Sequence, residues 1–424
     1  MQLFVEQLKG WTNPSDAFVA LFANLENCFW LDREFANPGN RFSVIGSGKS
    51  VKVDSIQELS GHLLPSGSYE FPFDFNTGLV GFVDFEAVNL KFLRVDSAIV
   101  FDHENRHIYL LARSASKAKF TRWLDAALLR LGLIGGEVLK FLGENSDHLF
   151  ESLATRNSDD EYLALIERSK HHIANGDVYQ LCLTNQISVT AKVNPLVVYM
   201  KLRRQNPAPY SSFIRIGETT LVCSSPESFL RIEADGRVVT KPIKGTRPRG
   251  ETEEQDQNLR QQLTNDVKER AENLMIVDLM RNDLLKVCAP DSVTVEKLYD
   301  VESFATVHQL VSTVSGVLRD GESAVTALDA CFPGGSMTGA PKERAIQLIQ
   351  ELEGQPRGVY SGVNGFVSDS GTADLGMTIR SLVFEKGQIT VGVGGGITID
   401  SDPASELLET KIKAMALLKA VQEP

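Results

Sequence analysis

Residues 240–250 read TKPIKGTRPRG, and this stretch is the most informative in the chain. Two prolines and two glycines restrict the backbone around Lys244. Proline fixes φ, and glycine permits close approach between the backbone and a ligand. An amine that is held in a desolvated site, or beside other cations, loses its proton more readily and becomes a nucleophile. The stretch therefore predicts a lysine with a chemical role rather than one more solvated surface charge.

The composition of the whole chain limits the kinds of partner it can have. Of its 424 residues, 42% are hydrophobic and 23% are charged, as in soluble globular proteins. Its 43 basic and 55 acidic residues give a net charge of −12, which argues against nucleic acid or an anionic membrane surface as a bulk partner. No apolar run approaches about 20 residues, so no membrane span is expected, and no signal peptide is apparent. The five cysteines are widely spaced without a C-x-x-C pair, which predicts reduced thiols in a cytoplasmic protein.

Apolar periodicity and turn residues predict a mixture of strands and helices, and hence an α/β or α+β architecture. Polar, turn-rich stretches at 143–147 and 155–158 predict a boundary between an N-terminal region, 1–145, and a C-terminal region, 158–422. The strands are predicted at residues 28–31, 41–46, 78–83, 98–101, 107–111, 178–189, 211–216, 219–224, 229–240, 378–385 and 388–395. The helices are predicted at residues 117–133, 159–176, 264–287, 340–353 and 404–421.

Two of these predicted helices carry pairs of glutamates three residues apart, on one helical face. Glu269 and Glu272 lie on the first, and Glu406 and Glu409 lie on the second, with Lys413 four residues further on. Two such pairs facing each other make an all-oxygen site that suits Mg²⁺, which keeps several of its waters. The same spacing is also typical of solvated helix faces with Glu–Lys pairs, and spacing alone favours that interpretation.

A family resemblance changes this balance. From about residue 159 to residue 421, the motifs resemble in order those of the chorismate-utilising enzymes. The run KERAENLMIVDL (268–279) is similar to the metal-binding helix of that family, and SELLETKIKA (405–414) is similar to the second half of the same site. The resemblance implies a sandwich of two large antiparallel-rich sheets flanked by helices. It also implies Mg²⁺ as cofactor, with Glu272 and Glu409 as direct ligands and Glu269 and Glu406 as outer-shell carboxylates.

The remaining matches imply a site for chorismate. Arg380 resembles the family arginine that pairs with a carboxylate, a task that suits its bidentate fork. A glycine cluster alone is as typical of a turn, and a lone histidine on an apolar segment is more often a core residue. The resemblance nevertheless implies substrate contacts for both, and the full set of implied substrate-binding residues is Thr246, His308, Tyr360, Arg380, Gly394, Gly395, Gly396 and Lys413.

Three positions bear on the reaction. Glu227 follows a predicted strand and a proline and could be an exposed turn charge, but its family counterpart protonates the departing hydroxyl, which requires a raised pKa. Lys244 stands where the aminodeoxychorismate synthase component I subgroup has lysine and the anthranilate synthase subgroup has alanine. Gln180 stands where isochorismate and salicylate synthases have a lysine that activates water, so an amine nucleophile is favoured.

The resemblance thus implies conversion of chorismate and ammonia to 4-amino-4-deoxychorismate, for p-aminobenzoate and folate synthesis, through a covalent adduct between Lys244 and C2. The chain lacks a Gly-x-Cys-x-Gly nucleophile elbow, so ammonia is expected from a separate glutamine amidotransferase subunit in a heterodimer. Three alternatives remain open: anthranilate synthase component I, an aminodeoxychorismate synthase of a specialised pathway, and a non-catalytic chorismate- or amino-acid-binding protein. The sequence also leaves open the oligomeric state and whether tryptophan is bound.

Overall fold

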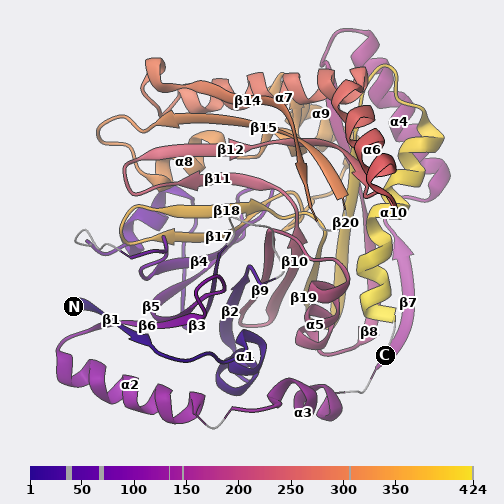
Figure 1. The fold of residues 1–424 in the computed structure, drawn as a ribbon. Coiled ribbons are helices and arrows are strands. Elements are labelled where there is room, and N and C mark those ends of the chain that lie inside the picture. The colour runs from indigo at the N-terminus through magenta and orange to yellow at the C-terminus, as the bar shows by residue number, and fades with distance from the viewer. Residues whose placement is uncertain (35–40, 66–70, 133, 146–147, 305–306, 423–424) are drawn as a thin grey trace.

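The computed structural model describes residues 1–34, 41–65, 71–132, 134–145, 148–304 and 307–422, and Figure 1 shows its fold. Two long runs of strands dominate, and every pair of neighbouring strands in them is antiparallel. In Figure 1, β14, β15, β12, β11, β18, β17 and β4 are stacked one below another, whereas β10, β19, β20 and β8 run steeply beside them. The predicted sandwich of antiparallel-rich sheets flanked by helices is confirmed.

The first run of paired strands takes in most of the N-terminal region and part of the C-terminal region. Its order is β6 (His107–Ser114), β5 (Leu90–Asp102), β3 (Phe42–Val51), β2 (Asn27–Asp32), β9 (Tyr210–Ile216), β10 (Thr219–Ser225), β19 (Ser381–Glu385), β20 (Gln388–Ile397), β8 (Gln180–Lys192) and β7 (Leu149–Thr155). Two further strands, β1 (Gln2–Leu8) and β16 (Gly339–Ala340), pair with β6 and β8.

The second run branches from the first at β5. Residues 90–95 of β5 pair with β4, and residues 97–102 pair with β6, so this one long strand belongs to both runs. The order continues as β4 (Gly78–Val83), β17 (Val363–Ser368), β18 (Ala373–Met377), β11 (Ser228–Ile232), β12 (Arg237–Lys241), β15 (Val307–Val317) and β14 (Thr294–Ser303), with β13 (Ile243–Pro248) also paired to β15.

Helices cover the outer faces and ends of these sheets, as Figure 1 shows. They are α1 (Pro14–Phe22), α2 (Lys117–Leu131), α3 (Glu137–Glu144), α4 (Asp159–Ala174), α5 (Pro195–Gln205), α6 (Glu253–Asn265), α7 (Val267–Leu285), α8 (Ala324–Cys331), α9 (Lys342–Glu353) and α10 (Pro403–Gln422). No helix in the described part of the chain is long and apolar enough to cross a membrane.

Several predicted elements differ from the structure in their bounds or type. The strand predicted at 229–240 is a hairpin, β11 and β12, because Gly236 adopts a φ of 82° in the turn and Asp235 Oδ1 accepts a hydrogen bond from the Arg237 amide. The helix predicted at 264–287 begins at Val267, where Asp266 caps the first turn by accepting from the Glu269 amide at 3.0 Å. The predicted helix 117–133 ends at Leu131, and residue 133 lies outside the described residues.

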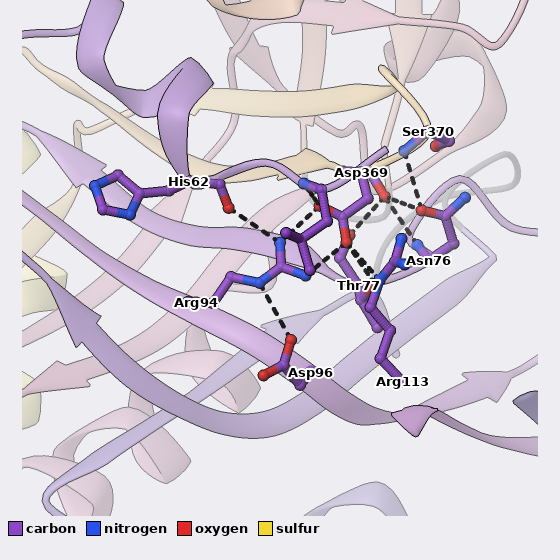
Figure 2. A network of polar contacts seen from close by, with 10 residues as sticks. His62, Asn76, Thr77, Arg94, Asp96, Arg113, Asp369 and Ser370 are labelled. Atoms are coloured by element: carbon purple, nitrogen blue, oxygen red, sulfur yellow. Dashed lines mark hydrogen bonds and ion pairs between the residues drawn. The ribbon is translucent and has the colours of Figure 1, made fainter. Parts of the chain in front are cut away.

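Strands from both sides of the predicted boundary share the sheets, and a polar cluster adds to their connection (Figure 2). The carboxylate of Asp369 accepts two hydrogen bonds from Arg94, at 2.6 and 2.7 Å, one from Arg113 Nε at 2.8 Å, and one from Thr77. Burial opposes ionisation, but these donors lower the pKa of Asp369 overall. The division into 1–145 and 158–422 stays a sequence-based prediction.

Candidate active site

A cavity of about 470 Å³ lies where α7, α10, β13 and the ends of β20 and β10 meet. It contains nearly all the side chains that the sequence predicts to be functional, although they are spread over almost 190 positions of the chain. Those that line it are Glu227, Lys244, Thr246, Glu269, Glu272, Tyr360, Arg380, Gly394, Gly395, Gly396, Glu406, Glu409 and Lys413.

Lys244 lies on β13, and its side chain is only 14% exposed. Its Nζ is 3.9 Å from Oε2 of Glu272. The next residue, Gly245, has a φ of 81°, and a Cβ there would lie 2.8 Å from a methyl group of Leu263 and 2.9 Å from the carboxyl carbon of Glu269. Only glycine therefore lets the backbone turn beside Lys244 while α6 and α7 pack against it.

Glu227 follows β10 and lines the same cavity as Lys244, with only 7% of its surface exposed. Burial raises the pKa of Glu227 to about 7, although a hydrogen bond from Ser336 and the charges of Lys244 and Lys413 act in the opposite direction. A carboxyl group with this pKa carries a proton in a large fraction of molecules at neutral pH. Glu227 therefore has the property that a general acid requires.

Ser336 reaches Glu227 from a loop between α8 and α9 that is held by a buried lysine. Lys342 Nζ forms an ion pair with Asp283 of α7 at 2.5 Å. The same ammonium donates hydrogen bonds to the carbonyl oxygens of Cys331 and Pro333 at 2.9 and 2.8 Å. Because this clamp ties both ends of the loop to α7, Ser336 is held against the cavity.

The glutamates of α7 and α10 meet at one side of the cavity. Lys268 Nζ lies 3.8 Å from Oε1 of Glu272 and 3.5 Å from Oε1 of Glu406, so one ammonium stands between carboxylates from two helices. Burial raises the pKa of Glu272, and the negative charges of Glu406 and Glu409 add to this effect. Glu409 instead pairs with Lys413 at 2.7 Å.

The positions and chemistry of these carboxylates bear on whether they could bind a divalent cation. The ammonium of Lys268 lies between Glu272 and Glu406, where a metal cation would bind. Its position shows that a positive charge is electrostatically favoured between these two carboxylates. The donors are all oxygens, which is the ligand set that Mg²⁺ prefers. In the part of the chain that the structure describes, no three His, Cys, Asp or Glu side chains yet converge closely enough to hold a metal ion. The residues fit Mg²⁺ in chemistry, and their side chains must rearrange to bind it.

A second part of the lining carries the cations Arg380 and Lys413. Tyr360 and Arg380 line the cavity there together with Gly394 to Gly396, and Lys413 Nζ donates to the carbonyl of Gly394 at 2.8 Å. Burial lowers the pKa of Arg380. The ring of Tyr360 lies against Gly392, where a Cβ would be 2.0 Å from the ring, so glycine at 392 is required for Tyr360 to occupy this position.

Comparison with known proteins agrees with this geometry. Residues 52–419 match the family model described as chorismate binding enzyme. The chain belongs to this family. The resemblance predicted from the motifs is thereby confirmed.

Individual chorismate binding enzymes resemble the chain over most of its length. An aminodeoxychorismate synthase of Streptomyces griseus is 43% identical over 95% of this chain and 62% of its own length. An anthranilate synthase component 1 of Streptomyces coelicolor is 37% identical over 99% of this chain and 88% of its own. The crystal structure of anthranilate synthase component I from Streptococcus pneumoniae aligns with a TM-score of 0.79 at 28% identity, covering 90% of this chain and 93% of that one. The chain thus spans less than two thirds of the length of the Streptomyces aminodeoxychorismate synthases that it resembles.

The structure does not bring His308 to the cavity of this chorismate binding enzyme. Its Nδ1 lies 2.8 Å from Ser303 Oγ, and its Nε2 lies 2.9 Å from Oδ1 of Asp256. The neighbouring residue, Gln309, lines the cavity beside Thr246, its partner on β13. The reason is geometric, because successive side chains of a strand point to opposite faces.

Several residues that line the cavity were not predicted as site residues from sequence, among them Lys268, Gln309, Ser336 and Gly392. Only Lys268 had a usable signal, since it lies four residues before Glu272 and hence on the same helical face. Gln180, predicted to disfavour water as nucleophile, lies beside Lys244. A Cβ at Gly396 would be 2.3 Å from Nε2 of Gln180 and 3.3 Å from Nζ of Lys244.

Proposed function

We propose that this chorismate binding enzyme is an aminodeoxychorismate synthase component I, which converts chorismate and ammonia to 4-amino-4-deoxychorismate for p-aminobenzoate and folate synthesis. The observation that carries the proposal is the presence of Lys244 and Glu227 in the lining of one cavity, a candidate nucleophile together with an acid whose pKa is about 7. The names of relatives such as the Streptomyces griseus protein support it.

In this proposal chorismate lies between the two walls of the cavity. One carboxylate is held by Arg380, Tyr360 and the backbone at Gly394–Gly396, since a buried guanidinium binds a carboxylate through two parallel hydrogen bonds. The ring carboxylate lies towards α7 and α10, where Glu272 and Glu409 are the proposed direct Mg²⁺ ligands and Glu269 and Glu406 the proposed outer carboxylates. Mg²⁺ would supply positive charge that holds the ring carboxylate between otherwise repelling glutamates.

The residues of the chain then perform two substitutions. Lys244 releases a proton to solvent, and its free amine forms a bond to C2 while the ring double bond migrates and the C4–O bond breaks. Glu227 donates its proton to the departing hydroxyl, which leaves as water. Ammonia then forms a bond to C4, the double bond migrates back, the bond between C2 and Lys244 breaks, and ionised Glu227 takes up the proton that ammonia loses.

The proposal includes a partner and a location. The proposed source of ammonia is a separate glutamine amidotransferase subunit, and residues 1–424 contain no Gly-x-Cys-x-Gly elbow of a glutaminase. A cytoplasmic location is supported by the five cysteines, which are all free and buried, as expected for thiols in a reducing compartment.

Mass analysis of the products from chorismate, Mg²⁺ and an ammonium salt tests the proposal. The expected product is 4-amino-4-deoxychorismate, formed without release of pyruvate. Anthranilate with pyruvate would instead identify an anthranilate synthase, and isochorismate would identify water as the nucleophile. Chorismate binding in calorimetry without any turnover would identify a binding protein and refute the proposed activity.

A further inference from the structure

Lys268 occupies an unusual position for a surface lysine. It lies in the first turn of α7, half-exposed, at the edge of the cavity. Its Nζ is within 3.8 Å of Glu272 on its own helix and within 3.5 Å of Glu406 on α10. Glu406 is in turn held in place by Ser401, whose hydroxyl donates to it at 2.7 Å. The ammonium is therefore a cross-link between two helices that otherwise present repelling carboxylates.

The carboxylate of Glu272 has a cation on each side. Lys244 approaches Oε2 at 3.9 Å and Lys268 approaches Oε1 at 3.8 Å. A divalent ion bound to Glu272 would lie within a few ångströms of both ammonium groups, and like charges at such a distance repel strongly in a partly buried site. Lys244 is 14% exposed and confined by the cavity, whereas Lys268 is 50% exposed and has a long, flexible stem. Lys268 is thus the ammonium group that can move away from Glu272 when a divalent ion binds.

We infer that Lys268 is an internal counter-ion that competes with the divalent cation for Glu272 and Glu406 and swings into solvent when the cation binds. The inference rests on the proposed function only in taking Glu272 as a metal ligand. Competition from Lys268 makes the affinity for the divalent ion lower than the carboxylates alone would provide. When no ion is bound, Lys268 neutralises part of the negative charge of Glu272 and Glu406.

The test compares Lys268→Gln with the wild-type protein, using Mn²⁺ as probe because it takes the same oxygen ligands. Binding is followed by loss of the free-ion electron paramagnetic resonance signal, without chorismate and at fixed ionic strength. Lys268→Gln is expected to bind Mn²⁺ roughly three- to tenfold more tightly, as expected for losing two partly exposed ion pairs. Lys268→Arg, which keeps the charge, is expected to retain the wild-type affinity.

Lys411→Gln is the matched control. Lys411 is a comparably exposed lysine on α10 whose ion pair is with Asp159, away from the glutamates of the cavity. Its substitution removes the same charge and is expected to change Mn²⁺ affinity less than twofold. A second measurement is the rate of acetylation by acetic anhydride, read by peptide mass, which should rise at Lys268 and stay constant at Lys411 when Mn²⁺ is added.

The possible failures are distinguishable. Unchanged or weaker Mn²⁺ binding by Lys268→Gln, or no Mn²⁺ binding by either protein, overturns the counter-ion inference even if aminodeoxychorismate is formed. Weaker chorismate binding with unchanged Mn²⁺ binding would make Lys268 a substrate ligand instead. Tighter Mn²⁺ binding by Lys268→Gln in a protein that forms no aminodeoxychorismate supports the inference and refutes the proposed function.

Discussion

The proton on Glu227 should control both activity and stability, and the two effects can be worked out from its burial. Only 7% of the residue is exposed, and burial raises its pKa from 4.5 to about 7. If Glu227 is the acid that protonates the departing hydroxyl, its protonated fraction is one factor in kcat/KM for chorismate, and the free-amine fraction of Lys244 is the other. The protonated fraction of Glu227 is about one half at pH 7 and about one hundredth at pH 9, so this factor should fall roughly fiftyfold over the range.

The same titration affects folding, with a definite sign. The folded-state pKa lies above the unfolded-state value, so the stability contributed by this carboxyl group is fully present below pH 4.5 and is lost as the pH rises through about 7. The interval between 4.5 and about 7 corresponds to about 3 kcal/mol. Glu227→Gln cannot ionise at this position. The difference in unfolding free energy between this variant and the wild type should therefore shift by about 3 kcal/mol in favour of the variant between pH 4.5 and pH 9.

The assay is product formation between pH 6 and pH 9 at a fixed concentration of unprotonated ammonia, which removes the titration of the second substrate. Urea unfolding of both proteins over the same range and at pH 4.5 supplies the stability difference. A difference in unfolding free energy between the two proteins that stays constant from pH 4.5 to pH 8.5 would refute the argument. A Glu227→Gln variant with unimpaired activity and the same alkaline fall would refute the assignment of that fall to Glu227.

Four further predictions follow from the structure. Lys244→Ala, if folded, should lose product formation by roughly a thousandfold, and release of a C2-aminated product would fit the proposed roles; a wild-type rate with ammonia would contradict them. Gly392→Ala should raise KM for chorismate, because its Cβ meets the ring of Tyr360, whereas Gly61→Ala, with no heavy atom within 4 Å of its Cβ, is a control for a glycine loss on the surface. Removal of metal by a chelator should abolish product formation and added Mg²⁺ should restore it; activity that survives exhaustive chelation would contradict the proposed cofactor. Asp369→Asn should lower the unfolding free energy by about 3 kcal/mol, since it leaves the buried charge of Arg113 without its carboxylate, and urea unfolding measures this.

Local patterns predicted much of the fold. The C-terminal helix, predicted at 404–421, is α10 at Pro403–Gln422, and the strand predicted at 388–395 is β20 at Gln388–Ile397. Helix α6 was not predicted because it presents almost no apolar face; its one buried residue is Leu263. The 229–240 strand was wrong because alternation continues through the Asp-Gly turn, so periodicity alone could not separate the two strands of the hairpin.

The candidate site likewise has some features that local sequence patterns predict and others that they do not. The sequence by itself determined which residue types could meet, because a lysine between Pro and Gly and glutamates three residues apart are local properties of strand and helix. Tertiary structure alone decided which side chains share the cavity. Gln309 rather than His308 faces it because the register between β15 and β13 selects one face of the strand. Lys268 lies between two glutamates because α7 and α10, far apart in the chain, both present carboxylates to the cavity, and no local sequence pattern specifies the distance between them.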